Sequence, residues 1–93
     1  MLDRNIEIFI KVAEFNSFTV AAQVLYISQP AVSHAIKHLE DELKVQLFYR
    51  DKRKGLVITD IGKKILSLVR QMEDIDNRIT QIAYQENNLI SGT

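Results

Sequence analysis

The sequence predicts a mostly α-helical fold that carries one small β-hairpin and ends in a long helix. Apolar residues recur at steps of three and four along four segments, which is the spacing of amphipathic helices. Two short apolar runs flank a charged turn that ends at Gly55, which is typical of a hairpin. No helix breaker follows Gly62 as far as residue 87, so the last helix is expected to be long.

The first two helices are expected to be short. The segment "NIEIFIKVAEF" predicts a helix; its β-branched and aromatic content would also suit a strand, but helical spacing fits better. The residues "NSF" interrupt this helix, and Ser17 or Thr19 can cap a second one, "TVAAQVLY". Ala21 and Ala22 are small enough to let another helix approach closely. The apolar face of the first helix comprises Ile6, Phe9, Ile10 and Ala13.

The stretch "SQPAVSHAI", residues 28–36, marks the start of a third helix that is expected to run to about Leu43. Ser28 is a preferred N-cap residue, and proline is tolerated in the first turn because its missing N–H would have no partner there. The helix has two different faces. The apolar face comprises Val32, Ile36 and Leu39, and the polar residues are Gln29, Ser33, His34 and Lys37.

The stretch "LFYRDKRKGLVIT" holds two apolar runs on either side of a basic turn, so we expect a hairpin there, and Thr59 can cap the final helix. Helix, helix, tight turn, helix and basic hairpin is the element order of a winged helix-turn-helix, whose third helix enters the major groove of DNA. We therefore expect a winged helix-turn-helix DNA-binding domain over residues 1–58, a linker or dimerisation helix over 59–88 and a tail over 89–93.

Charge is distributed unevenly along a chain whose net charge is zero. Residues 44–64 carry seven basic and two acidic side chains, a net charge of +5. Residues 1–43 carry three basic and six acidic side chains, and residues 65–93 carry two and four. A basic block in a neutral chain is what a focused phosphate-binding surface requires. Taken alone, the block is also compatible with a solvated loop rich in lysine and arginine.

Composition and motifs argue against several other classes. The absence of cysteine fits a reducing compartment, and the apolar runs are too short to span a bilayer. With no signal-peptide pattern at the N-terminus, we expect a cytoplasmic protein without a membrane partner. No catalytic triad, glycine-rich phosphate loop or carboxylate pair appears, so neither enzyme activity nor a cofactor is expected. His34 and His38 could form half a zinc site, but no third ligand follows, so no metal site is expected.

Over roughly residues 1–65 the sequence resembles the DNA-binding domain of the LysR-type transcriptional regulators. The shared landmarks are, in order, "FIKVAEFNSFTVAA", "SQPAVS", "LEDELKVQLFYR" and "LVITDIG", and the later helix is similar to the family's linker helix. The resemblance implies a bacterial regulator that binds double-stranded DNA, with a small-molecule effector bound by a larger C-terminal domain and a tetramer as the full-length assembly. We expect this chain to be a DNA-binding fragment that lacks the effector domain.

The resemblance also implies which residues contact DNA. Gln29 would pair with adenine, Pro30 and Ala31 would contact thymine methyl groups, and Ser33 and Thr19 would bind phosphates. Arg53 would reach from the hairpin tip into the adjacent minor groove. His34 departs from the family, which usually has arginine there, and imidazole is shorter and largely neutral at pH 7. The predicted DNA-binding set comprises Thr19, Ser28, Gln29, Pro30, Ala31, Ser33, His34, Lys37, Arg50, Lys52, Arg53 and Lys54.

The last helix carries apolar residues at alternating steps of four and three, which is a heptad seam. A domain of this size could cover the start of the stripe but hardly its far end, where each wet side chain would forgo roughly 1.5–3 kcal/mol. We therefore expect a homodimer, which the resemblance implies has antiparallel linker helices; an intramolecular core helix is the alternative. The predicted seam comprises Ile61, Ile65, Leu68, Met72, Ile75, Ile79 and Ile82.

These features bear on three classes of function: specific DNA binding, a winged helix used as a protein-interaction module, and an enzyme. The basic hairpin and "SQPAVS" favour DNA binding, to an interrupted palindrome if the chain dimerises. Two further groups have structural interpretations. Phe9, Phe18 and Phe48 are assigned to the core, and Glu40, Asp41 and Glu42 to a solvated patch near the end of the third helix.

Overall fold

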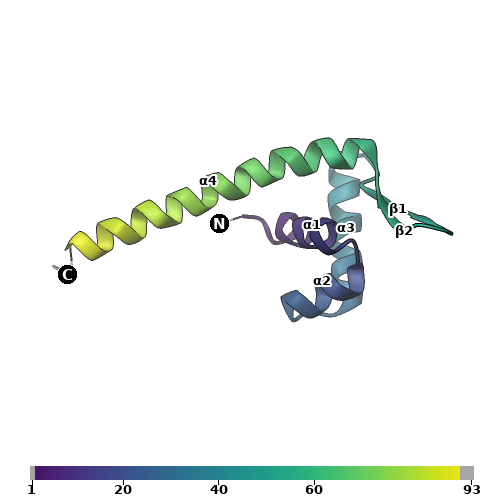
Figure 1. Cartoon of the computed structure of the whole chain (residues 1–93), viewed down its shortest axis with the longest axis horizontal. Helices are drawn as coiled ribbons and strands as arrows, with labels where there is room; N and C mark the ends of the chain where they lie inside the picture. The colour runs from purple at the N-terminus through teal and green to yellow at the C-terminus, as the bar shows by residue number, and fades with distance from the viewer. Residues whose placement is uncertain (1, 91–93) are drawn as a thin grey trace.

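The computed structural model describes residues 2–90, which form four helices and one two-stranded antiparallel sheet (Figure 1). The elements are α1 (Arg4–Phe15), α2 (Phe18–Leu25), α3 (Gln29–Leu43), β1 (Phe48–Asp51), β2 (Gly55–Ile58) and α4 (Asp60–Ile90). We call α1, α2, α3 and the β1–β2 hairpin the head. The predicted fold class, mostly helical with one small hairpin and a long last helix, is confirmed.

Short polar side chains set where the first three helices begin. Asp3 accepts a hydrogen bond from the Asn5 backbone N–H at 2.7 Å, before α1. Ser17 accepts from the Val20 N–H at 3.1 Å and Ser28 from the Ala31 N–H at 3.2 Å. Ser28 is the predicted N-cap of α3, and of the two candidates for α2, Ser17 and Thr19, the structure selects Ser17. Each of these three helices ends at a residue in the left-handed conformation: Asn16, Tyr26 and Lys44.

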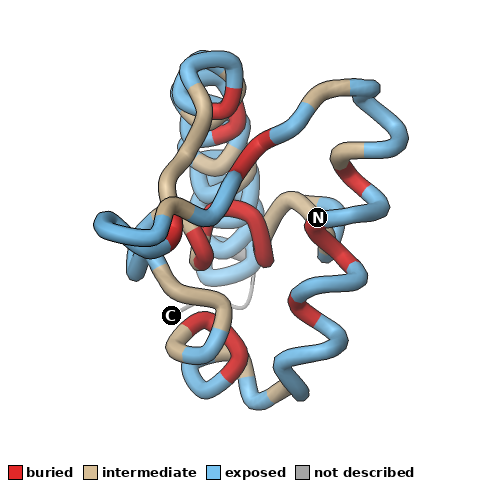
Figure 2. Tube along the Cα trace, turned by 90° about the vertical axis from the view of Figure 1, so that its right-hand side faces the viewer, coloured by how far each residue is buried: buried red, intermediate tan, exposed pale blue. Residues whose placement is uncertain are grey.

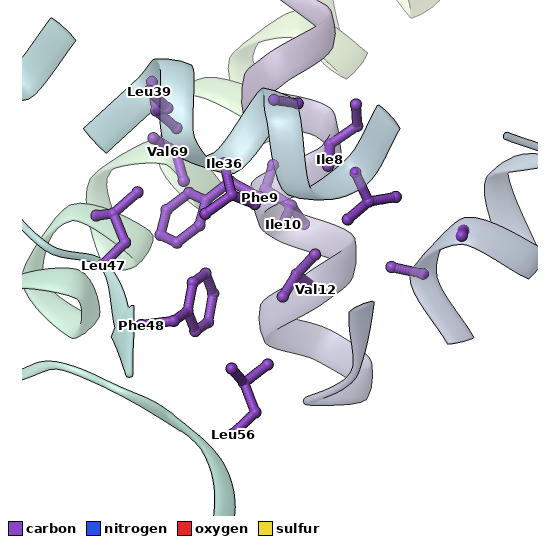
Figure 3. Close-up of a cluster of buried hydrophobic side chains, with 14 residues drawn as sticks. Ile8, Phe9, Ile10, Val12, Ile36, Leu39, Leu47, Phe48, Leu56 and Val69 are labelled. Atoms are coloured by element: carbon purple, nitrogen blue, oxygen red, sulfur yellow. The ribbon is translucent and has the colours of Figure 1, made fainter. Parts of the chain in front are cut away.

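One hydrophobic core joins the head to the beginning of α4 (Figure 3). Phe9 is completely buried and packs edge-to-face against Phe48, with 5.7 Å between ring centroids. Leu47, Leu56 and Val69 bring the hairpin region and α4 into the same cluster. Buried and more exposed residues alternate along α1 and α3, as amphipathic packing around a single core requires (Figure 2).

The hairpin pairs Phe48 with Ile58 at its base and Asp51 with Gly55 at its tip. Phe48 and Leu56 are buried in the core, whereas the turn over residues 52–54 is exposed. Gly55 has a φ of +78°, which a residue with a Cβ rarely adopts. The base of the hairpin is therefore fixed by the core, and its tip projects from the head (Figure 1).

Only the first part of α4 packs on the head. Val69 is buried and Ile65 and Leu66 are half-buried, but from Asn77 to Leu89 every residue is exposed. The long axis of the molecule measures 58 Å because α4 extends well past the head (Figure 1).

Candidate nucleic-acid interface

The two faces of α3 have opposite environments. Val32, Ala35, Ile36 and Leu39 are buried against the rest of the head. The other face carries exposed side chains that line one shallow hollow at the N-terminal part of the helix: Gln29, Pro30, Ser33, His34 and Lys37. An exposed helix face with polar groups of this kind has the dimensions and the hydrogen-bonding capacity to enter a major groove.

Thr19, on the first turn of α2, contacts this face directly. Its hydroxyl donates a hydrogen bond to Oε1 of Gln29 at 3.2 Å. A carbonyl oxygen accepts two hydrogen bonds, so this contact leaves Gln29 with one acceptor site and both amide protons. The sequence predicted Thr19 and Gln29 as separate DNA contacts; the structure joins them, so that α2 orients the Gln29 side chain.

Arg50, on β1, extends the polar surface toward the hairpin. A groove between α3 and β1 is lined in part by Ser33, Lys37 and Arg50. The Arg50 guanidinium carbon lies 5.4 Å from the centroid of the Phe18 ring, and that ring packs edge-on against Phe48. Phe18 is half-buried and lies at the edge of the core, where its outer face supports the arginine.

The tip of the hairpin is shaped by Asp51. Its carboxylate Oδ1 accepts hydrogen bonds from the backbone N–H groups of Arg53 at 2.7 Å and Lys54 at 2.9 Å. These two bonds hold the pKa of Asp51 below its usual value, and the bond from Lys54 has the larger effect. Because the acid is occupied by the backbone, the side chains of Lys52, Arg53 and Lys54 stay exposed at the turn.

The predicted DNA-binding residues fall into three groups. Five line the hollow on α3, with Thr19 bonded to one of them; Arg50 borders the groove beside α3; and three basic residues occupy the hairpin tip. Ser28 uses its hydroxyl as the helix cap, and Ala31 lies in a neighbouring groove with His34 and His38. Lys37 also lies 3.6 Å from Asp41, in an exposed ion pair that contributes little to stability.

One interpretation from the sequence is wrong. Asp41 and Glu42 are exposed as expected, but Glu40 is half-buried. Its Oε2 accepts hydrogen bonds from the backbone N–H groups of Leu47 at 2.7 Å and Phe48 at 3.4 Å. A carboxylate seven residues before its partner gives no periodic signal in the sequence, so the contact was not predicted.

The predicted dimer seam is largely exposed within one chain. Ile65 is the exception, since it is half-buried and packs against the core. The exposed fraction reaches 55% at Ile75 and 66% at Ile82. The other exposed members are Ile61, Leu68, Met72 and Ile79.

Two searches of the described residues address other sites. Over residues 2–90, no three or more histidine, cysteine, aspartate or glutamate side chains gather where they could hold a metal ion. In the same range, no helix is both long and apolar enough to cross a membrane.

Comparisons with known proteins agree on one family. The family described as "Bacterial regulatory helix-turn-helix protein, lysR family" matches residues 4–63. The uncharacterized HTH-type transcriptional regulator YoaU of Bacillus subtilis (strain 168) is 53% identical over 88 residues, which are 95% of this chain and 30% of YoaU. The chain thus spans about a third of the length of such curated relatives.

Solved structures give the same result. The crystal structure of the CbnR_DBD–DNA complex matches with a TM-score of 0.81 and 30% identity, covering 92% of this chain and 98% of that one. Full-length CbnR complexed with its target DNA matches with a TM-score of 0.78 and 31% identity, covering 89% of this chain and 28% of that one.

Proposed function

Since the chain belongs to the LysR family of bacterial transcriptional regulators and forms the DNA-binding domain of such a protein, we propose that it binds an interrupted palindrome as a homodimer. In this proposal α3 reads base edges in the major groove, the hairpin tip binds the adjacent minor groove and the neighbouring phosphates, and α4 joins two copies. It acts in the cytoplasm, where bacterial DNA lies, and as a binding domain rather than an enzyme.

The observation that carries the proposal is the continuity between α3 and the hairpin. The hollow lined by Gln29 and His34 and the groove lined by Arg50 share Ser33 and Lys37. Reading groups and phosphate-binding groups therefore lie side by side on one surface, which a protein that follows a groove and its backbone requires. The match to the CbnR_DBD–DNA complex, which covers 98% of the CbnR_DBD chain, supports the proposal.

Gln29 is the strongest candidate for base recognition. Its remaining acceptor site and its amide protons match the N6 donor and N7 acceptor of adenine. The hydrogen bond from Thr19 restricts the side chain before DNA arrives, which reduces the entropy lost on binding. Pro30 and Ala31 present apolar atoms on the same exposed turn, suited to a thymine methyl group.

The exposed stripe on α4 supports the proposed dimer. Side chains such as Met72, Ile75 and Ile79 are spaced as heptad positions and remain in water in a single chain. Two copies related by a two-fold axis would bury both stripes and present two α3 helices to two half-sites, which makes a palindrome the matching target.

Binding selection followed by a salt titration tests the proposal. We expect a random duplex pool to yield an interrupted palindrome and affinity for it to fall steeply with salt, because lysine and arginine release counterions from phosphates. His34→Arg is expected to strengthen binding and to change the preferred site, because guanidinium pairs with guanine in two hydrogen bonds. Equal affinity for selected and random duplexes at moderate salt would rule out specific recognition.

A further inference from the structure

Three elements of the chain meet at one backbone segment, residues 46–48, which leads into β1. Glu40 reaches it from the C-terminal part of α3, and Thr59 and Gly62 reach it from the start of α4. We call Glu40, Thr59 and Gly62, together with this segment, the joint. Glu40 also lines the groove that holds Lys37 and Arg50, but none of the three joint residues belongs to the predicted DNA-binding set.

The α3 side of the joint is a carboxylate that binds backbone amides. Glu40 Oε2 accepts from the Leu47 N–H at 2.7 Å and from the Phe48 N–H at 3.4 Å. Phe48 is the first residue of β1, so Glu40 binds the backbone at the point where the hairpin begins. Hydrogen bonds to an ionised acceptor are stronger than neutral ones, so Glu40 fixes the segment firmly to α3.

The α4 side of the joint is built on Thr59. Its backbone N–H donates to the Leu47 carbonyl at 2.9 Å, and its hydroxyl donates to the Gln46 carbonyl at 2.6 Å. The same hydroxyl oxygen accepts from the Gly62 N–H at 2.9 Å, which caps the first turn of α4. One threonine therefore connects the start of α4 to the segment that Glu40 holds.

Gly62 determines how closely α4 approaches. A Cβ at this position would lie 2.6 Å from the Leu47 carbonyl oxygen and 2.8 Å from Ile58 Cγ1. The Leu47 oxygen is a backbone atom that cannot rotate away, whereas the Ile58 side chain can adjust. A side chain at residue 62 must therefore shift the backbone of α4 relative to Leu47. The direction of α4 relative to α3 is thus set by contacts on both sides of Leu47.

We infer that the joint determines the half-site spacing that the dimer selects, independently of the bases that α3 reads. This inference rests on the proposed function, since it needs a DNA-binding dimer joined through α4. At a rise of 1.5 Å per residue, Ile75 lies about 22 Å along α4 from its start. A tilt of about 10° at the joint would shift the dimer contact by about 4 Å relative to α3, close to one base-pair step of about 3.4 Å.

Glu40, Thr59 and Gly62 are therefore positioning residues, and their signature is a change in spacing without a change in base preference. The experiment uses the whole chain and two sets of duplexes. One set holds a single selected half-site. The other holds two such half-sites in palindromic arrangement, separated by spacers that increase by one base pair over one helical turn. Affinity is measured for every duplex, and sedimentation and thermal melting verify that each variant is folded and dimeric.

For the wild-type chain we expect one optimal spacer. Gly62→Ala should lose about tenfold or more at that spacer, because bivalent binding fails when the geometry does not match, and should shift or flatten the optimum. Its affinity for the single half-site should stay within about twofold, as should its base preference. Asn77→Ala, at an exposed position on α4, is the matched control and should keep the wild-type spacer profile.

Thr59→Val serves as the second variant if Gly62→Ala does not fold. It keeps the size of the side chain but removes the hydroxyl, and it should broaden the spacer optimum, while Thr59→Ser should restore it. A wild-type spacer profile in a folded, dimeric Gly62→Ala or Thr59→Val chain overturns the inference. A wild-type chain that binds palindromes with no spacer preference overturns it too, whereas a wild-type chain with no preference for the half-site overturns the proposed function itself.

Discussion

The head and the outer part of α4, residues 77–89, differ in the environment of their apolar side chains. In the head, Phe9 is completely buried and contacts residues from several elements. On the outer part of α4, Ile82 is 66% exposed and belongs to a regular stripe of similar residues. The head buries its own apolar groups, whereas α4 carries an apolar stripe that is exposed among the described residues. In the proposed dimer a second copy of the chain covers this stripe.

This difference has a consequence for stability. A helix that lacks tertiary contacts is marginal in water, since helical stability in proteins comes mainly from packing of an amphipathic face. From Asn77 onward α4 gains no buried contact with the head. We expect the helicity of this part of α4 to depend on protein concentration and the helicity of the head to be independent of it.

The largest effect is expected in the head. Phe9→Ala removes a ring that packs against Phe48 and leaves a cavity at the centre of the core, which should cost about 3–5 kcal/mol in the free energy of unfolding. A domain of this size has only about 5–15 kcal/mol in total, so the variant should be largely unstable. Urea unfolding followed by circular dichroism measures the loss. Ile82→Ala, examined at a concentration where the chain is monomeric, should leave the transition of the head unchanged, and an equal loss would contradict the comparison.

The next effect is expected on α4 and in the assembly. Ile75→Glu places a charge in the middle of the stripe, and burying an unpaired carboxylate should weaken dimerisation by about a hundredfold or more. Sedimentation at micromolar concentration should show a dimer for the wild type and a monomer for the variant, with full palindromes bound poorly. Asn77→Glu adds the same charge at an exposed position off the seam and should remain dimeric. A wild-type chain that stays monomeric at high concentration would refute the dimer.

Local patterns in the sequence predicted the elements of both regions. Ser17 and Ser28 indicated where α2 and α3 begin, because a cap acts within three residues of itself. The stripe on α4 was visible because its members repeat along one helix. The roles of the predicted DNA-binding residues came from the resemblance to the LysR family, and most of these residues lie in two continuous stretches, "SQPAVSH" and the basic turn.

Contacts between elements could not be predicted in this way. The bond from Thr19 to Gln29, the stacking of Arg50 on Phe18 and the capture of backbone amides by Glu40 join residues 7 to 32 positions apart. Each depends on how two elements pack, which no spacing rule encodes. Glu40 shows the limit most clearly, because in the sequence it looks the same as its exposed neighbours Asp41 and Glu42.

A third variant tests the DNA-binding surface of the head. Gln29→Ala should cost about 1–3 kcal/mol on the best palindrome and relax the choice of base at one position, because a bidentate contact to adenine is lost. It should not change the dimer, just as Ile75→Glu should not change the base preference of a single half-site. Gln81→Ala, at an exposed position of α4, is the control. Unchanged affinity and preference in Gln29→Ala would mean that a different face of α3 contacts DNA.

The smallest effect concerns the hairpin tip, which is as exposed as the outer part of α4 but is held by its own hydrogen bonds. Asp51 accepts from the N–H groups of Arg53 and Lys54, and these bonds lower its pKa. Because the pKa is lowered, the ionised carboxylate stabilises the turn fully at pH values above the ordinary pKa of 3.8. This stabilisation is lost as the pH falls through the lower pKa of the folded state. Asp51→Asn should lose the same support at neutral pH, seen as faster amide hydrogen exchange at Arg53 and Lys54 with no change in global unfolding. Because the tip needs no second molecule, this exchange should be independent of protein concentration, unlike that of the outer part of α4. If amide exchange at the tip did depend on protein concentration, the local hydrogen bonds of Asp51 would not distinguish the tip from the outer part of α4.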